Sequence, residues 1–342
     1  MFLKNFFEDS ARQYPDKIAS EEGEKRYSYA ETERTANKLA NYLQKLPVGP
    51  EDKVVILLPR RAEVTIVMLG ILKTGAAYIP LDPEIPADRV NFIMEDANAK
   101  MLITSDEIMK NIGSQFNSFP IYNIDKSWKE LESYSDTKPT VEGRSEDNLC
   151  YMIYTSGTTG KPKGVLLMHK NAATYIHGAQ KIYPIDQSDR ALQGFSVSFD
   201  ASVEEIWVPL SVGATLVVGT FDIMRSGDQF SSKLRTLNIT FLSCAPTLLS
   251  MVKEDIPCLK ILIFGGEVCS KDIANRWCKA GRTVYNTYGP TEATVIATYS
   301  ILKPGEEVTI GKALDKYEVL LIDEELNPVT ELDKEGETLI GG

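Results

Sequence analysis

The sequence is poor in residues that hold metals or form disulfides. Its 342 residues include only two histidines and five cysteines, at positions 150, 244, 258, 269 and 278, and no two cysteines form a CxxC pair. An odd number of unpaired cysteines argues against a disulfide framework and against a zinc site. Buried free thiols are the expectation.

Long apolar runs and an excess of positive charge are also lacking. No apolar run reaches the roughly 20 residues that a membrane span needs, and the N-terminus turns acidic too soon for a signal peptide. The net charge of −11 disfavours nucleic acid as a partner. These absences predict a cytoplasmic protein with no membrane or nucleic-acid partner.

Apolar spacing predicts strands that alternate with helices, which is typical of parallel sheets covered on both faces. The expected strands are 54–58, 101–104, 120–124 and 149–154, then 216–218, 239–243, 259–264 and 283–286. We expect two doubly wound α/β lobes packed together with helices within residues 1–298, roughly 50–190 and 1–49 with 191–298. Short alternating pieces at 308–311, 317–323 and 337–340 predict that residues 299–342 form the start of a β-rich, barrel-like lobe.

The most distinctive stretch is YTSGTTGKPKG at residues 154–164, with three glycines, four serine or threonine hydroxyls and two lysines. Glycines let backbone N–H groups face an anion, and hydroxyls and lysines add donors and charge. A solvated hairpin turn would leave the hydroxyl density unexplained. A P-loop fits badly, because Thr155 stands at its first glycine and Pro162 follows Lys161. The stretch predicts a phosphate-binding loop between two strands.

The second series of strands places three loops at one edge of a sheet. Ligands of doubly wound sheets gather outside the carboxyl ends of the strands, which here are residues 243–244, 265–267 and 286–288. We expect these loops to line one cleft.

Four sequence motifs resemble those of a known family: YTSGTTGKPKG, FDASVEEIW at 199–207, GGE at 265–267 and NTYGPTEATV at 286–295. Together they resemble the adenylate-forming superfamily, and most closely the amino-acid adenylation domains of nonribosomal peptide synthetases. The similarity runs from about residue 6 to the last residue.

The resemblance implies ATP as a substrate and Mg²⁺ held by Glu292. Tyr288 would stack on the adenine, and Asn286 would bind its exocyclic amine. The residues that it implies for nucleotide binding are Thr155, Ser156, Gly157, Thr158, Thr159, Gly160, Lys161, Gly265, Gly266, Glu267, Asn286, Thr287, Tyr288, Gly289 and Thr291. The implied catalytic residues are Thr155, Lys163, Thr291 and Glu292.

For the amino acid, the resemblance implies that Asp200 receives the α-ammonium and that Phe199 lies near the tunnel of a carrier's phosphopantetheine. The side-chain pocket would be formed by Ala201, Glu204, Ser243, Ile263, Gly265, Thr287, Val295 and Ile296. Glu204 is its only charged member, which favours a basic side chain, lysine first and ornithine second. Arginine, a β-amino basic acid and the terminal amine of a diamino acid are further alternatives for the substrate. The alternative is that Glu204 faces solvent, as Glu205 is expected to, and that the substrate is neutral.

The implied reaction joins an amino acid to AMP, with release of pyrophosphate, before transfer to a carrier protein. An acyl- or aryl-CoA ligase and a non-catalytic nucleotide-binding module are the alternatives. The family's ribose-binding aspartate, hinge and C-terminal lid lysine find no counterpart, so this chain resembles the large N-terminal part of the domain. We expect impaired adenylate formation from it alone, and either a monomer or a part of a multidomain protein.

Overall fold

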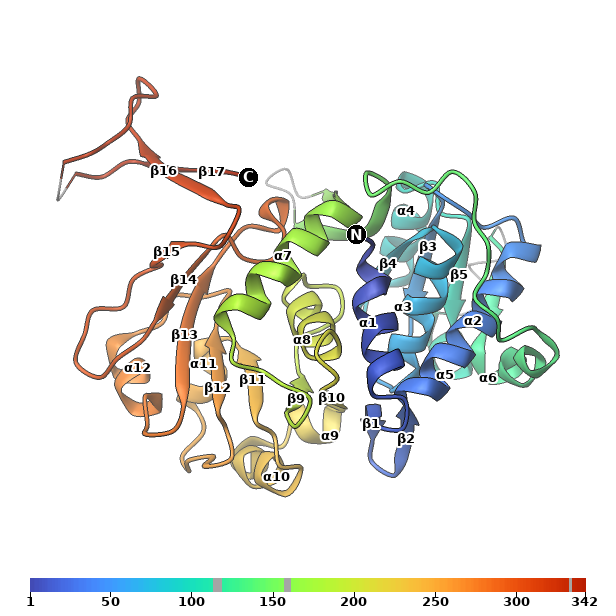
Figure 1. Cartoon of the computed structure of the whole chain (residues 1–342), viewed down its shortest axis with the longest axis horizontal. Coiled ribbons are helices and arrows are strands. Elements are labelled where there is room, and N and C mark those ends of the chain that lie inside the picture. The colour runs from blue at the N-terminus through green and yellow to red at the C-terminus, as the bar shows by residue number, and fades with distance from the viewer. Residues whose placement is uncertain (113–118, 157–160, 332–333) are drawn as a thin grey trace.

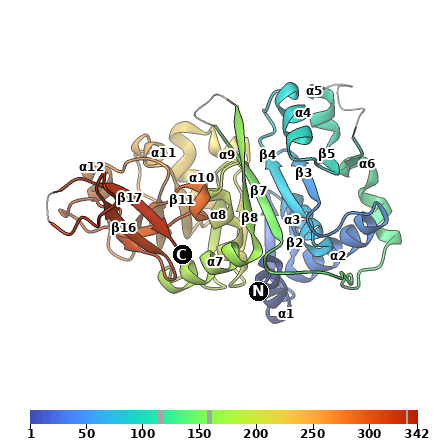
Figure 2. The ribbon, with the colours of Figure 1, turned by 90° about the horizontal axis from the view of Figure 1, so that it is seen from above.

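The structure, a computed structural model, describes residues 1–112, 119–156, 161–331 and 334–342. Two α/β lobes lie side by side (Figure 1, Figure 2). Where they meet, the helices α1 (Leu3–Gln13), α7 (His169–Ile182) and α8 (Ala201–Leu210) pack against one another. The two sheets and these helices share one continuous apolar core.

The first lobe contains a six-stranded sheet. Its strands, in spatial order, are β6 (Ile121–Asn123), β5 (Met101–Thr104), β3 (Lys53–Leu57), β4 (Ala77–Leu81), β7 (Leu149–Ser156) and β8 (Pro162–Met168). All neighbours are parallel except β7 and β8, which are antiparallel. The predicted strand–loop–strand arrangement around the glycine-rich stretch is therefore confirmed. Residues 157–160 of that loop lie outside the described residues.

The second lobe contains a nine-stranded sheet. Its strands, in spatial order, are β15 (Lys312–Ala313), β14 (Thr298–Ile301), β13 (Thr283–Tyr288), β12 (Ile261–Phe264), β11 (Phe241–Cys244), β9 (Arg190–Gln193), β10 (Thr215–Val218), β1 (Ile18–Glu22) and β2 (Lys25–Ser28). The strands from β13 to β1 are parallel, and the pairs at both edges are antiparallel. An N-terminal segment thus completes a sheet made mostly of residues beyond 190.

Side-chain alternation along the strands explains why both faces of each sheet are covered. Ile261 and Ile263 of β12 join the core between the lobes, whereas Leu262 and Phe264 join a second core under the outer helices. The further helices are α2 (Tyr29–Lys45), α3 (Glu63–Thr74), α4 (Ala87–Asp96), α5 (Asp106–Ile112), α6 (Ile124–Ser127), α9 (Phe221–Met224), α10 (Phe230–Thr236), α11 (Pro246–Ser250) and α12 (Lys271–Trp277). Short 3₁₀ turns are η2 (Trp128–Ser133), η3 (Gly227–Gln229) and η4 (Thr291–Ala293). The expected α/β architecture is confirmed.

Several details differ from the sequence expectation. β1, β4, β9 and α7 were not predicted, and residues 308–311 do not form a strand. β14 and β15 lie beyond or across the expected division at residue 298, yet they pair with the nine-stranded sheet. Cys150, Cys244 and Cys269 are buried free thiols as expected, but Cys258 and Cys278 are only half-buried. In the described part of the chain, no helix has both the length and the apolar character needed to cross a membrane.

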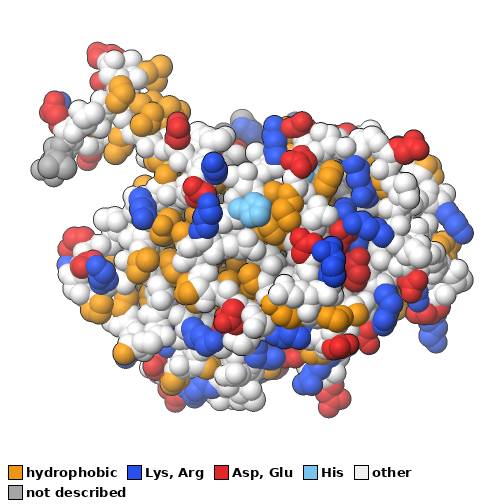
Figure 3. All heavy atoms as spheres, in the orientation of Figure 1, with side chains coloured by type: hydrophobic (Ala, Val, Ile, Leu, Met, Phe, Trp, Pro, Cys, Tyr) orange, Lys and Arg blue, Asp and Glu red, His pale blue; other side chains and the backbone are white. Residues whose placement is uncertain are grey.

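The strands β16 (Glu318–Ile322) and β17 (Glu337–Gly341) form a separate antiparallel hairpin. It stands clear of the body, with hydrophobic side chains along it (Figure 1, Figure 3). Leu320, Leu321 and Leu339 are about half exposed there.

Candidate functional site

The carboxyl ends of β11, β12 and β13 meet at one edge of the second sheet. Cys244 pairs with Phe264, and Phe264 pairs with Asn286, so the ends of β11 and β12 lie level with Asn286 of β13. The hydroxyl of Thr287 donates to the carbonyl of Phe264 at 3.0 Å. The loops that the sheet rule predicted to converge are thus adjacent.

The residues expected around adenine lie at this edge. The amide nitrogen of Asn286 donates to the carbonyl of Thr309 at 2.9 Å, and no donor to its Oδ1 is found among the described residues. Because the amide nitrogen bonds Thr309, the amide oxygen of Asn286 can accept a hydrogen bond from another group. The ring of Tyr288 is 42% exposed at the end of β13, as a stacking surface requires. Gly266 and Glu267 are exposed nearby, and the hydroxyl of Thr247 donates to Glu267 at 2.7 Å.

The segment after Tyr288 has an unusual backbone. Thr294 and Val295 are both β-branched, yet their φ angles are +62° and +71°. Such residues rarely adopt positive φ, and strain of this kind concentrates at functional sites. A Cβ on Gly289 would lie 2.5 Å from the Cα of Ile296, so only glycine lets the chain pass this close.

A cavity of about 500 Å³ brings together five of the sequence-predicted site residues. Thr155 and Ser156 come from the end of β7, Phe199 and Asp200 from the loop before α8, and Thr291 from η4. Phe199 is 62% exposed at this cavity. Two segments from the second lobe therefore face the strand that leads into the glycine-rich loop of the first.

Asp200 presents an unsatisfied acceptor at the cavity. Its Oδ2 is buried and has no hydrogen-bond partner within the described residues. Burial raises the pKa of this carboxyl above its usual range, although the Thr291 side chain acts in the opposite direction. A buried acceptor without a donor costs free energy, and an incoming ammonium would relieve that cost.

Glu204, one helical turn along α8, is 2% exposed and does not face solvent. Its Oε2 accepts hydrogen bonds from the hydroxyls of Tyr175 at 2.9 Å and Tyr183 at 2.8 Å. Its Oε1 accepts one hydrogen bond, from Ser243 at 2.8 Å. Burial raises the pKa of Glu204, and the negative charge of Asp200 adds to the rise, whereas the three hydroxyls lower it. No basic side chain forms an ion pair with Glu204 in the part of the chain that the structure describes.

Tyr175 and Tyr183 were not among the residues expected from the sequence. Tyr175 lies on α7 and Tyr183 is the residue that ends this helix. Both side chains are buried, and both hydroxyls donate to Oε2 of Glu204. The only available signal was the use of tyrosine at buried positions where phenylalanine would pack equally well. That signal does not identify the partner of either hydroxyl.

The expectation that Glu205 faces solvent was wrong. Glu205 is fully buried, and its two carboxylate oxygens accept hydrogen bonds from the backbone N–H of Gly194 at 3.0 Å. Its Oε2 also accepts from the N–H of Phe195 at 3.0 Å. Burial raises the pKa of Glu205 to about 8, although these N–H groups oppose the rise. The helical pattern alone could not reveal hydrogen-bond donors that belong to a loop backbone.

The remaining site candidates fall into two groups. The side chains of Ile263, Thr287, Val295 and Ile296 are buried, Ala201 and Gly265 are half-buried, and these six residues do not line the cavity at Asp200. Lys161 and Lys163 are exposed at the start of β8, and Gly157, Thr158, Thr159 and Gly160 lie outside the described residues.

Glu292 is exposed on η4 and lines a second cavity, of about 550 Å³, together with Lys170 and Lys316. Within the described residues, no group of three or more carboxylate, histidine or cysteine side chains surrounds a common point. Glu292 therefore stands as a single carboxylate beside the Thr291 hydroxyl.

Comparison with known proteins adds a family. The profile of the family described as AMP-binding enzyme matches residues 7–342. Delta-poly-L-ornithine synthetase of Acinetobacter baumannii is 38% identical over 98% of this chain, and bacitracin synthase 3 of Bacillus licheniformis is 35% identical over 98%. The chain spans 24% of the length of the first protein and 5% of the second.

Solved structures match over nearly the whole chain. The nonribosomal peptide synthetase FmoA3 with α-methyl-L-serine-AMP bound has a TM-score of 0.90 at 25% identity, covering 99% of this chain and 39% of that one. The N-terminal subdomain of Klebsiella oxytoca NpsA in complex with 3-hydroxyanthranilyl-AMSN shares the fold, with a TM-score of 0.84 at 24% identity, covering 100% of this chain and 86% of that one.

Proposed function

Since this chain belongs to the family of AMP-binding enzymes, we propose that it is the ATP- and amino-acid-binding part of a ligase that activates a basic amino acid. In this reaction a carboxylate oxygen of the amino acid bonds to the α-phosphorus of ATP, and the bond from that phosphorus to the pyrophosphate oxygen breaks. The products are an aminoacyl-adenylate and pyrophosphate. No protein nucleophile takes part, so the protein acts by positioning and by stabilising charge.

The nucleotide would lie along the edge formed by β12 and β13. Tyr288 offers the exposed ring for adenine, and Oδ1 of Asn286, for which the described residues provide no donor, offers an acceptor for its amine. Thr155 and Thr291 line the same cavity as Asp200, where the α-phosphate and the amino-acid carboxylate must meet. Lys163 is exposed and pairs with Thr155 across β7 and β8, and it would supply positive charge to the phosphates.

Magnesium is compatible with the residues present. Mg²⁺ takes one or two carboxylates together with phosphate oxygens, and Glu292 is an exposed single carboxylate next to Thr291. When bound, the ion would neutralise charge on the phosphates. The protein's own part is to hold Glu292 on the short turn η4.

One observation carries the choice of a basic substrate, namely the buried Glu204 with three hydroxyl donors. A carboxylate has about four acceptor positions. Oε2 of Glu204 already accepts two hydrogen bonds but Oε1 only one, so Oε1 has room for one more donor. A buried carboxylate gains most from a cationic partner. An ammonium at the end of the substrate side chain supplies one, with lysine as the first candidate and ornithine as the second.

The similarity to a delta-poly-L-ornithine synthetase is compatible with this choice, since the name of that protein refers to a polymer of ornithine, a basic amino acid. Relatives that are named as peptide synthetases support a carrier protein as the next partner, with the aminoacyl group passing to a phosphopantetheine thiol. Phe199, exposed at the cavity that holds Asp200, would lie near the approach of that thiol.

ATP–pyrophosphate exchange on the whole protein with a panel of acids tests the proposal. We expect exchange with lysine or ornithine to exceed exchange with norleucine at least tenfold. Exchange with acids that lack an α-amine would instead identify an acyl-CoA ligase type of enzyme, because Asp200 would then have no role. Exchange with no acid would leave a nucleotide-binding module, and both outcomes would overturn the proposal.

A further inference from the structure

The loop that carries Asp200 is held in place by groups outside the expected substrate pocket. Residues 194–199 connect β9 to α8, and Asp200 immediately precedes α8. Glu205 lies on the first turns of α8 and points back at the start of this loop. Its carboxylate accepts the backbone N–H groups of Gly194 and Phe195, all at 3.0 Å. One side chain of α8 thus fixes the opposite end of the loop that delivers Asp200 to that helix.

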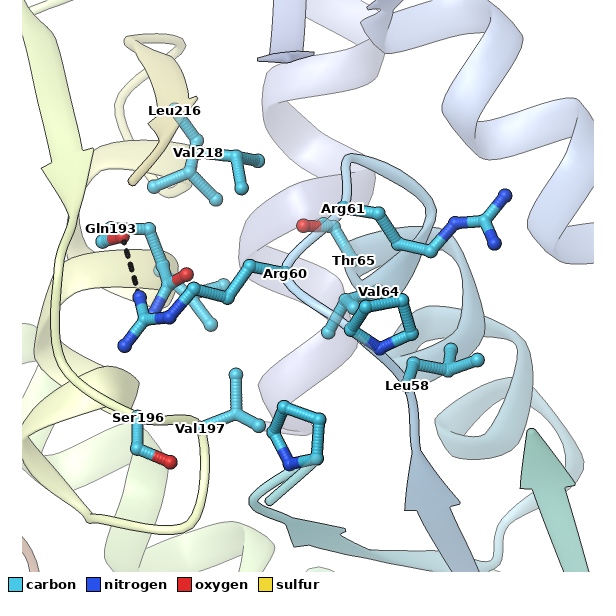
Figure 4. Close-up of a pocket in the computed structure, with 13 residues that line it drawn as sticks. Leu58, Arg60, Arg61, Val64, Thr65, Gln193, Ser196, Val197, Leu216 and Val218 are labelled. Atoms are coloured by element: carbon cyan, nitrogen blue, oxygen red, sulfur yellow. Dashed lines mark hydrogen bonds between the residues drawn. The ribbon is translucent and has the colours of Figure 1, made fainter. Parts of the chain in front are cut away.

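The first lobe holds the same loop from the other side. Asp82, which follows β4, accepts a hydrogen bond from the hydroxyl of Ser196 at 2.5 Å. Arg60, which follows β3, donates to the carbonyl of Gly219 at 3.1 Å and to that of Gln193 at 3.5 Å. Figure 4 shows the Arg60 side chain extending across the gap between the lobes toward Gln193, while Arg61 points away from it.

Packing alone does not account for a carboxylate at position 205. A fully buried carboxyl group is expensive, and an apolar side chain of similar size would fill the space at lower cost. The positive charge of Arg60 lies close enough to affect Glu205. What the carboxylate provides and a leucine cannot is a pair of acceptors for two successive backbone N–H groups.

We propose that Glu205 is a positioning residue, which holds residues 194–199 so that the unpartnered Oδ2 of Asp200 faces the α-ammonium of the substrate. Asp82 aligns the same loop with the first lobe, and Arg60 holds the carbonyl of Gln193, where the loop begins. The assignment rests on the proposed function, because it requires Asp200 to be the receiver of the amine. Glu205 itself touches no substrate atom.

The test compares two ligands that differ only in the α-amine. They are a non-hydrolysable lysyl-adenylate analogue with a sulfamoyl linkage and its counterpart made with 6-aminohexanoic acid. Calorimetry on this chain gives both dissociation constants, and their ratio measures the recognition of the α-amine. Asp200→Asn sets the reference, because it should abolish the preference for the aminated analogue.

For Glu205→Ala we expect the preference for the aminated analogue to fall at least tenfold, while the affinity for the counterpart changes less than threefold. Glu205→Gln should keep most of the preference, because one amide oxygen can replace Oε2 as acceptor for both N–H groups. A purely structural role predicts equal weakening of both ligands. That result, or an unchanged preference, would overturn the inference.

A milder variant decides the matter if Glu205→Ala fails to fold. Ser196→Ala removes the hydrogen bond to Asp82, together with the contacts of the same hydroxyl with Ser198, and leaves the core intact. A selective loss of α-amine preference in this variant supports the inference, and an unchanged preference overturns it. If Asp200→Asn itself keeps the preference, the error lies in the proposed function and not in the role of Glu205 alone.

Discussion

The hydroxyl of Tyr183 donates to Oε2 of Glu204 at 2.8 Å, and that of Tyr175 donates to the same oxygen at 2.9 Å. Two tyrosines from one helix and its end thereby fix the orientation of a buried carboxylate. Oε1, with the single Ser243 donor, is therefore the oxygen that we propose receives the substrate ammonium.

Removing either tyrosine hydroxyl should weaken binding of a basic substrate. Tyr175→Phe and Tyr183→Phe each delete one hydrogen bond that orients the Glu204 carboxylate. That bond contributes roughly 1.5–3 kcal/mol to stability. Because the carboxylate is then free to turn away from the substrate, we expect about a tenfold weaker affinity. Binding of the lysyl-adenylate analogue by calorimetry measures this effect. A norleucyl analogue should bind each variant and the parent chain almost equally.

Tyr285→Phe is the matched control for these two variants. The Tyr285 ring packs edge-on against Tyr183 with centroids 4.9 Å apart, but its hydroxyl donates to the carbonyl of Ile182 instead of to Glu204. It should leave the preference for lysyl over norleucyl unchanged. Equal losses in all three variants would show that the tyrosines act through packing only.

Much of the fold follows from local patterns, and the exceptions have physical causes. The strand Met101–Thr104 is fully buried and matches its predicted bounds, and Gly75 ends α3 with φ of +91°, the left-handed conformation that favours glycine. The helix α7 was missed, because its apolar residues are interspersed with His169, Thr174 and His177. β1 was missed because a short strand at Ile18 finds its partner β10 almost 200 residues away.

The site shows the same division between local and long-range information. The motifs located Asp200, Thr291 and Thr155, which meet at one cavity although they come from distant segments. Partners of side chains could not be predicted, since neither the tyrosines at Glu204 nor the backbone groups at Glu205 leave a repeating signal in sequence. The phosphate-binding role of residues 157–160 remains a prediction.

A buried charge cluster should make the stability of the protein depend on acid pH. Glu8 of α1 forms ion pairs with Lys4, Lys73 and Lys138. Although burial raises the pKa of Glu8, the charges of Lys73 and Lys4 outweigh it and lower the pKa to about 2, from 4.5 in an unfolded chain. A depressed pKa contributes stability above the unfolded value, and that stability is lost as the pH falls from about 4.5 to about 2.

The expected contribution of Glu8 at neutral pH is about 3 kcal/mol of unfolding free energy. Urea unfolding of Glu8→Gln should therefore show a loss of that order at pH 7, and the difference from the parent chain should shrink toward pH 2. Asp9→Asn on the same helix is the control, because Asp9 pairs with Arg12 at the surface and should cost little. Parallel stability curves for Glu8→Gln and the parent would refute the role of Glu8.

Glu292 should be required for the effect of magnesium on nucleotide binding. Calorimetric titration with ATP, in Mg²⁺ and in EDTA, measures this effect directly. In Glu292→Gln we expect the gain in affinity from Mg²⁺ to fall about tenfold, with binding in EDTA unchanged, because an amide oxygen is a poorer ligand for a hard cation. Glu254→Gln, at an exposed carboxylate paired with Arg235, should respond to Mg²⁺ as the parent does. An unaltered response in Glu292→Gln would place the ion elsewhere.

The claim on which the account depends most is that Glu204 selects a positively charged substrate side chain. The most direct measurement is the ratio of affinities for the lysyl- and norleucyl-adenylate analogues, in the parent chain and in Glu204→Gln. These ligands have side chains of nearly equal length and differ in the terminal ammonium. We expect the parent to favour the lysyl analogue at least thirtyfold and Glu204→Gln to lose that preference. A parent that binds the norleucyl analogue as tightly as the lysyl analogue, or a variant that keeps the preference, would contradict the account.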